Sequence, residues 1–95
     1  MERPEADALL DALLEELAAL EHERWAHWQK YVHEQGELQT DGSLLIPSEK
    51  VRRWQEQIET KYADLSEAEK DSDREQVRRY VPLIASALAG NDNAK

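Results

Sequence analysis

Apolar residues recur at helical spacing over the first third of the chain. With Leu10 placed at zero and about 100° of rotation per residue, further apolar side chains fall on one stripe. They are Leu13, Leu14, Leu17, Trp28, Tyr31 and Val32. This period predicts one long helix over residues 5–33.

Two charged residues, Glu21 and Arg24, lie inside that stripe, where apolar residues are expected. Because they are three positions apart on a helix, they can neutralise each other. A partly buried ion pair is therefore the simpler interpretation. The alternative is that the stripe faces a cleft and that Arg24 contacts a bound anion there.

The next segment changes from a helical to a strand pattern. Gly36 ends the helix, and the stretch "ELQTDGSLLIP" predicts a small β-hairpin. Asp41-Gly42 forms the turn and residues 44–46 form the return strand. Residues 48–62 then predict a second helix, with Pro47 suited to its first turn.

A capping-box pattern, Ser66 with Glu69, begins the third helix. Its apolar stripe starts only at Val77, and Pro82 should kink or divide the helix by removing one backbone hydrogen bond. Gly90-Asn91 is a plausible C-cap. The predicted fold class is mainly α, with three principal helices and a short β-hairpin. We expect a partly flexible N-terminus over 1–8, one domain over 9–90 and a flexible tail over 91–95.

Composition excludes several functional classes. The chain has 95 residues, 12 basic and 21 acidic side chains, and a formal net charge of −9. General nucleic-acid binding needs a basic face, and anionic membranes are disfavoured for the same reason. Without cysteine there is no thiol chemistry or Cys-based zinc site. The segment "MERP" is no signal peptide and no apolar run has membrane length, so we expect a cytoplasmic protein.

Metal binding and catalysis have little support in the pattern. His22 and His27 are five positions apart, about 140° around a helix, and cannot grip one ion as an i, i+4 pair does. The chain has neither a nucleophile elbow nor a phosphate-cradling glycine loop. We therefore expect a protein that is not an enzyme and uses no metal and no cofactor.

Trp25 and the start of the third helix carry the candidate binding chemistry. Trp25 lies at the edge of the apolar stripe, where it either closes the core or offers a stacking platform to a planar base. In "EAEKDSDREQ", Lys70 and Arg74 are one turn apart and share a face. They pair either with a phosphate or with acidic neighbours. Asp73 lies about 100° from Arg74 and is able to accept a hydrogen bond from a ribose hydroxyl or a base amine.

Three short motifs occur in the order found in the ryanodine-receptor repeat domain (RyR domain), which the chain resembles over roughly residues 13–88. The first is His22 with Trp25, the second is "LIP" at 45–47, and the third is the acidic, Lys-containing helix start. The matching residues of the third motif are Glu69, Lys70, Ser72, Asp73 and Arg74. The receptor repeats also have a Gly-Trp-x-Tyr-Gly segment, which is missing here, and lack the helix expected over 48–62. The chain is thus similar to the single-domain version of bacterial and phage proteins.

The resemblance implies a ligand and an assembly. Receptor repeats occur in tandem pairs, and a pair can hold an adenine nucleotide between two equivalent tryptophans. A single repeat would restore this arrangement as a homodimer or higher homo-oligomer. Bacterial and phage RyR domains have been proposed to sense nucleotide-derived signals in defence systems.

The leading hypothesis is therefore a non-catalytic binding module for a nucleotide-derived small molecule, acting as a sensor or as a phage-encoded sponge in the bacterial cytosol. Trp25 would stack on the base, and His22 and Asp73 would contact polar groups. Lys70, Arg74 and Arg24 would hold phosphates. The rival hypothesis is an acidic helical interaction module or inhibitor that docks on a basic partner protein, as the net charge and the acidic stretch at 64–75 suggest.

Overall fold

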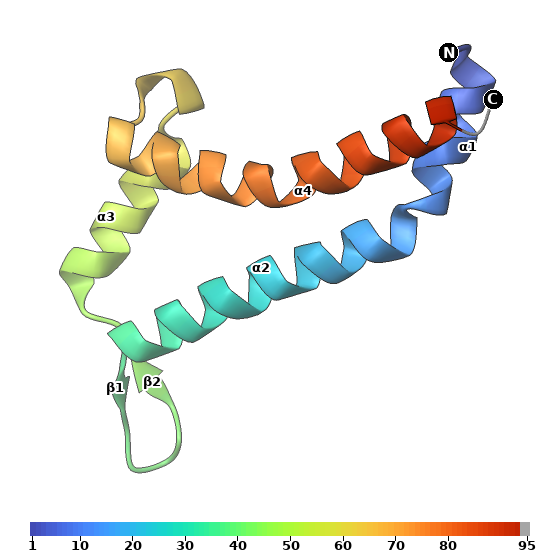
Figure 1. Cartoon of the computed structure of the whole chain (residues 1–95). Coiled ribbons are helices and arrows are strands. Elements are labelled where there is room, and N and C mark those ends of the chain that lie inside the picture. The colour runs from blue at the N-terminus through green and yellow to red at the C-terminus, as the bar shows by residue number, and fades with distance from the viewer. Residues whose placement is uncertain (94–95) are drawn as a thin grey trace. The chain divides into compact units, whose positions relative to one another are not determined.

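The computed structural model describes residues 1–93, and side chains as far as residue 90. The described chain is mainly helical, with four α-helices, one short 3₁₀-helix and one two-stranded antiparallel hairpin (Figure 1). The order is α1 (Arg3–Ala12), α2 (Leu14–Gln35), β1 (Glu37–Leu38), β2 (Leu44–Leu45), α3 (Ser48–Glu59), η1 (Tyr62–Asp64) and α4 (Glu67–Asn93). The predicted fold class is thus confirmed at the level of a mainly helical chain with a small hairpin.

The first helix is interrupted, contrary to the single helix expected over 5–33. Leu13 separates α1 from α2, with φ −91° and ψ −4°. Its N–H donates to the carbonyl of Leu10, at 3.0 Å, and so closes a tighter turn than an α-helix. Among the residues whose side chains the structure describes, Leu13 alone is buried, with 8% of its surface exposed. The interruption coincides with that burial, and without a glycine or proline the sequence does not signal it.

The hairpin follows the prediction. Glu37 pairs with Leu45 and Leu38 with Leu44. Gly42 has φ +90°, a conformation that costs residues with a Cβ atom free energy. At the entrance to the hairpin, a Cβ atom on Gly36 would lie 3.3 Å from the Leu44 Cβ, so the close approach of this backbone to β2 favours glycine.

The third and fourth helices differ from prediction at their ends. Helix α3 stops at Glu59 rather than at 62, because Thr60 is extended. Helix α4 begins after the predicted capping box and continues through Pro82, so the helix is not divided there. Proline removes one donor but leaves the neighbouring backbone hydrogen bonds, which suffice to keep the helix continuous. The expected C-cap at Gly90 is also wrong, since α4 runs to Asn93; the last two residues of the expected tail lie outside the described residues.

The chain forms two compact units. Unit 1 comprises Met1–Arg24 together with the chain from Ser72 onward, and unit 2 comprises Trp25–Asp71. In unit 1, the first half of α2 and the later part of α4 run in opposite directions (Figure 1). In unit 2, three rings join the end of α2 to α3. The ring centroids of Trp28 lie 5.4 Å from Tyr31 and 6.0 Å from Trp54, and those of Tyr31 and Trp54 are 6.4 Å apart.

Candidate functional site

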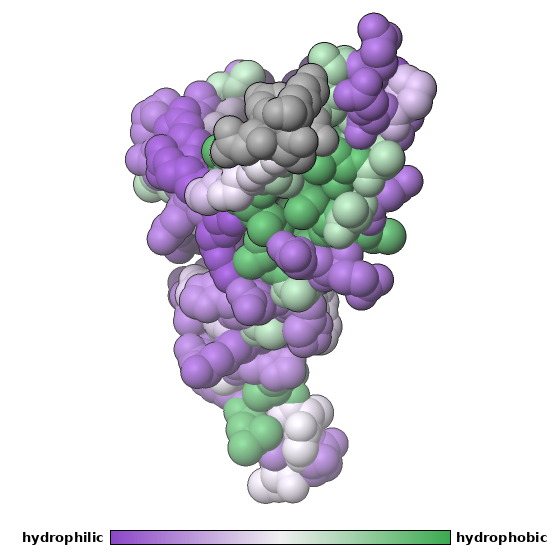
Figure 2. Space-filling model, turned by 45° about the vertical axis from the view of Figure 1, so that its right-hand side comes forward, coloured by the Kyte–Doolittle hydropathy of each residue, from purple (hydrophilic) through white to green (hydrophobic). Residues whose placement is uncertain are grey.

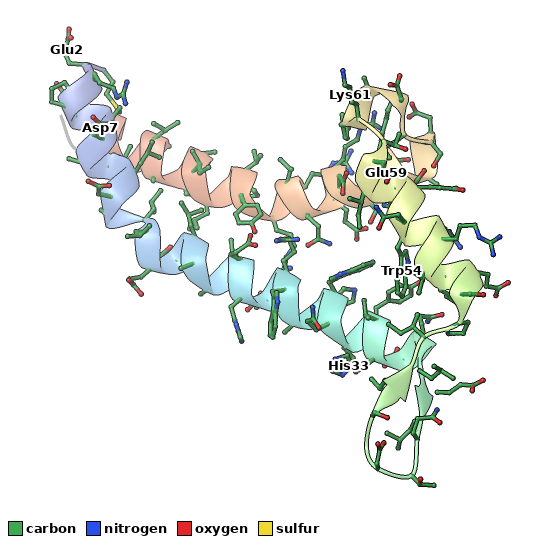
Figure 3. All side chains as sticks on the ribbon, turned by 180° about the vertical axis from the view of Figure 1, so that it is seen from behind. Glu2, Asp7, His33, Trp54, Glu59 and Lys61 are labelled. Atoms are coloured by element: carbon green, nitrogen blue, oxygen red, sulfur yellow. The ribbon has the colours of Figure 1, made fainter. Side chains whose placement is uncertain are left out.

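Trp25 lies on α2, and its side chain is 54% exposed. A tryptophan buries a large apolar area when it closes a core, so an exposure of this size is informative. Trp28, three positions later, instead packs against Trp54, and Figure 3 shows Trp54 on the side of α3 that faces the end of α2. Of the three tryptophans, Trp25 therefore has the largest exposed fraction.

Arg24 is held by an acidic partner in unit 1. Its Nε donates to Glu21 Oε2 at 3.1 Å, and a terminal guanidinium nitrogen donates to Glu21 Oε1. The hydroxyl of Tyr80, from α4, donates to the same Glu21 Oε2 at 2.8 Å. The ion pair of Glu21 and Arg24 is the simpler of the two interpretations given by the sequence. Both side chains are about half exposed, however, and not partly buried as expected. The charge of Arg24 is thus already compensated, which weakens its expected role as a phosphate contact.

The hydrogen bonds around Glu21 have a clear effect on its titration. The Arg24 guanidinium, followed by the Tyr80 hydroxyl, lowers the pKa of Glu21 from 4.5 to about 2. Conversely, the hydrogen bond to Glu21 raises the pKa of both Arg24 and Tyr80. Glu21 is therefore ionised at neutral pH and binds both partners in its charged form.

A second polar contact joins the same two helices. Arg79, on α4, forms an ion pair with Glu23 on α2. The sequence analysis paired neither Arg79 with Glu23 nor Tyr80 with Glu21. The carboxylate at position 21, inside an apolar stripe, was the one signal for such a partner, and the sequence does not show which residue supplies it.

The start of α4 is ordered by its own polar groups. The Ser66 hydroxyl donates to Glu69 Oε1 at 2.8 Å and accepts the Glu69 N–H at 3.2 Å. The Ser66 N–H completes the box, at 3.2 Å from the same Glu69 oxygen. These hydrogen bonds lower the pKa of Glu69. The predicted capping box is confirmed, and it takes up one of the backbone donors that an anion would use at a helix N-terminus.

Lys70 is largely covered but weakly paired. Its side chain is 18% exposed, and its Nζ lies 3.7 Å from the Glu67 carboxylate and 5.9 Å from the centroid of the Tyr62 ring. The first distance exceeds that of an ordinary hydrogen bond, and Glu67 is 75% exposed. A more strongly charged oxygen ligand would therefore compete well with Glu67 for Lys70.

The six predicted site residues are divided between the units. His22, Arg24, Asp73 and Arg74 belong to unit 1, and Trp25 and Lys70 belong to unit 2. Lys70 and Arg74 lie one turn apart on α4, as predicted, and both are partly covered, whereas Asp73 is exposed.

Unit 2 also contains an apolar groove that sequence reasoning missed. It has a volume of about 490 Å³ and is lined by Trp28, Gln29, Val32, Ile46, Trp54, Gln57 and Ile58. Trp28 and Val32 belong to the apolar stripe predicted for the first helix, but Trp28 is 44% exposed, and Ile58 on α3 is 75% exposed. The groove is open to solvent, and most of the residues that line it are apolar.

The comparisons with known proteins add no relative. No family model, no curated protein and no solved structure matches the chain significantly. Within the described residues there is no cluster of three metal-ligating side chains. None of the described helices has the length and apolar character needed to cross a membrane.

Proposed function

We propose that this protein is a non-catalytic binding module for a nucleotide-derived small molecule, which it sequesters or senses. The observation that carries the proposal is the 54% exposure of Trp25 on a helix that also carries His22 one turn earlier. Stacking of a base on an exposed aromatic ring is worth about 1–3 kcal/mol and does not depend on the identity of the base.

The remaining predicted residues take polar roles in this proposal. Lys70 and Arg74 contact phosphate, and His22 and Asp73 contact base or ribose groups. Arg24 neutralises the charge of Glu21 and does not contact the ligand directly. The resemblance of the His22 and Trp25 motif to the RyR domain supports the same ligand class.

A thermal-shift panel tests this function. Mononucleotides, dinucleotides, cyclic nucleotides and ADP-ribose derivatives are each added to the full chain. A compound present at about 100 times its Kd adds roughly 2.7 kcal/mol to the free energy of unfolding, which raises the melting temperature by several degrees. Trp25→Ala should abolish the rise, while Trp25→Phe should keep part of it because the ring still stacks. The proposal fails if no compound shifts the wild-type protein, or if Trp25→Ala responds like the wild type.

The apolar groove of unit 2 favours a second candidate function, the docking of a basic partner protein. An amphipathic helix places residues at i, i+3, i+4 and i+7 into such a groove. Unit 2 has ten carboxylates against six lysines and arginines, so its charge attracts a basic helix.

A pair of synthetic peptides tests this second function. A helical peptide with leucines on one face and lysines on the other should bind the groove and change the fluorescence of Trp28 and Trp54. The Ile58→Asp substitution should weaken this binding at least about tenfold. The matched peptide with glutamate in place of lysine should not bind. Equal binding of both peptides, or binding unaffected by Ile58→Asp, would reject this function. Trp25→Ala serves as the control, because Trp25 does not line the groove.

A further inference from the structure

In unit 1 each of the two antiparallel helices has one covered side. On α2 the half-buried positions are Leu17 and Leu20, which continue the row begun by the buried Leu13. On α4 the corresponding row is Gln76, Tyr80, Leu83 and Ala87, of which all are half-buried. The hydrogen bond from Tyr80 to Glu21 also connects the two helices. This side of each helix is occupied within the chain.

A second row lies one position further along each helix, and it is exposed except at Ile84, which is half-buried. On α4 it consists of Val77, Val81, Ile84 and Leu88, with spacings of four, three and four residues. Val77 is 56% exposed, Val81 54% and Leu88 40%, and Leu14 begins the equivalent row on α2 with 61% exposure. Alternating spacings of four and three are those of a helix that packs against a partner helix in a bundle.

The two uncovered rows lie on the same face of the helix pair. Each row is displaced by one residue, about 100°, from the covered row of its helix. Because the helices are antiparallel, the same displacement along each chain turns both rows toward the same side. Figure 2 shows hydrophobic residues gathered on unit 1. We call this surface, with Leu14, Val77, Val81, Ile84 and Leu88, the bundle face.

Charge distinguishes the possible occupants of the bundle face. Residues 14–24 of α2 carry four carboxylates and one arginine, whereas residues 74–90 of α4 carry three arginines and one carboxylate. A second copy related by a two-fold axis parallel to the helices places α2 of each copy against α4 of the other. The acidic segment of each copy then lies beside the basic segment of the other, and adjacent helices are antiparallel, as in a four-helix bundle. A two-fold axis across the helices would instead bring the acidic segments together.

We propose that the bundle face is a dimer interface, covered by the same face of a second copy of this chain. Glu21 occupies a position in the exposed row of α2, and a polar residue at such a position restricts the register of the helices. Its hydrogen bonds to Arg24 and Tyr80 keep it satisfied when the face is covered. The inference does not depend on any ligand and so stands apart from the proposed function.

Sedimentation equilibrium and native mass spectrometry of the full chain test the dimer. The wild-type protein should have twice the chain mass of 11.0 kDa at micromolar concentration. Val81→Glu places an unpaired carboxylate in the interface and should raise the dimer Kd more than about a hundredfold. Ile58→Glu is the matched control, since it makes the same change at an exposed aliphatic residue of α3 in unit 2 and should leave the Kd unchanged.

A second pair of variants tests the charge argument. Arg78→Glu should weaken the dimer about tenfold or more, because Arg78 is exposed and has no ion-pair partner within the described chain. Arg52→Glu, an identical change on α3, should have no effect. The proposal is overturned if the wild-type chain stays monomeric at about 100 μM. It is also overturned if the bundle face is found to bind a different protein rather than a second copy of the chain. The proposal is also overturned if the Val81→Glu variant still forms the dimer, whether or not circular dichroism shows a change in its helix content.

Discussion

At the scale of single residues, Glu21 shows how a polar side chain is accommodated in an apolar row. Its carboxylate accepts hydrogen bonds from Arg24 on the same helix and from Tyr80 on α4. The spacing of Glu21 and Arg24 was enough to predict their pair, because side chains three positions apart on a helix are neighbours. Tyr80 is 59 positions away in sequence, and only the fold brings its hydroxyl to the same oxygen.

The titration of Glu21 gives a direct test of this cluster. By NMR of the side-chain carboxyl carbon, the pKa of Glu21 in the wild-type protein should be about 2. Arg24→Gln should raise this pKa the most, since Arg24 is the largest cause of the shift, and Tyr80→Phe should raise it less. A wild-type midpoint near the ordinary value of 4.5 would contradict the cluster.

The same shift predicts a pH dependence of stability. The pKa is lower in the folded chain than the ordinary 4.5, so the stabilisation is present above pH 4.5 and is lost as the pH falls toward 2. The melting-temperature difference between wild type and Glu21→Gln should therefore shrink over that range. Glu16→Gln is the control, because the Glu16 carboxylate has no hydrogen-bond or ion-pair partner in the described chain. A difference that stays constant with pH would rule out the linkage.

At the scale of elements, local chemistry was readable from the sequence and tertiary effects were not. The hairpin and the start of α4 were predicted correctly because Asp41-Gly42 and the Ser66–Glu69 box act through neighbours in the chain. The turn at Leu13 was missed because it follows burial, which has no local signature. The helix through Pro82 was misjudged because surrounding hydrogen bonds outweigh the loss of one donor.

Ser66→Ala tests how much the capping box contributes to α4. The change removes the acceptor of the Glu69 N–H and should lower the free energy of unfolding by about 1 kcal/mol in urea denaturation. Ser86→Ala, in the middle of the same helix and exposed, should be neutral or slightly stabilising, because alanine has the higher helix propensity. Equal effects of the two variants would show that the box adds nothing specific.

At the scale of the whole molecule, the candidate site was less predictable than the elements. Sequence placed Lys70 and Arg74 one turn apart correctly, since helical spacing fixes that relation. It did not anticipate that the six residues belong to two units, or that helical apolar positions such as Ile58 are exposed. Periodicity identifies an apolar face but not what covers it, and in this chain most apolar faces are covered only in part.

The exposed bundle face has a consequence for thermal unfolding that depends on concentration. Dimerisation stabilises the folded chain by mass action, so the melting temperature should rise with protein concentration. When the dimer Kd is far below the protein concentration, a hundredfold rise in concentration, from about 5 to 500 μM, stabilises the folded dimer by about 2.7 kcal/mol. Because unfolding of one dimer yields two chains, this is about 1.4 kcal/mol per chain. For a domain of this size that is a shift of roughly 6–11 °C by scanning calorimetry. Val81→Glu should melt at a lower temperature with no dependence on concentration, whereas Ile58→Glu should keep the slope. A wild-type melting temperature that is constant across this range would show that the bundle face is not closed by a second copy.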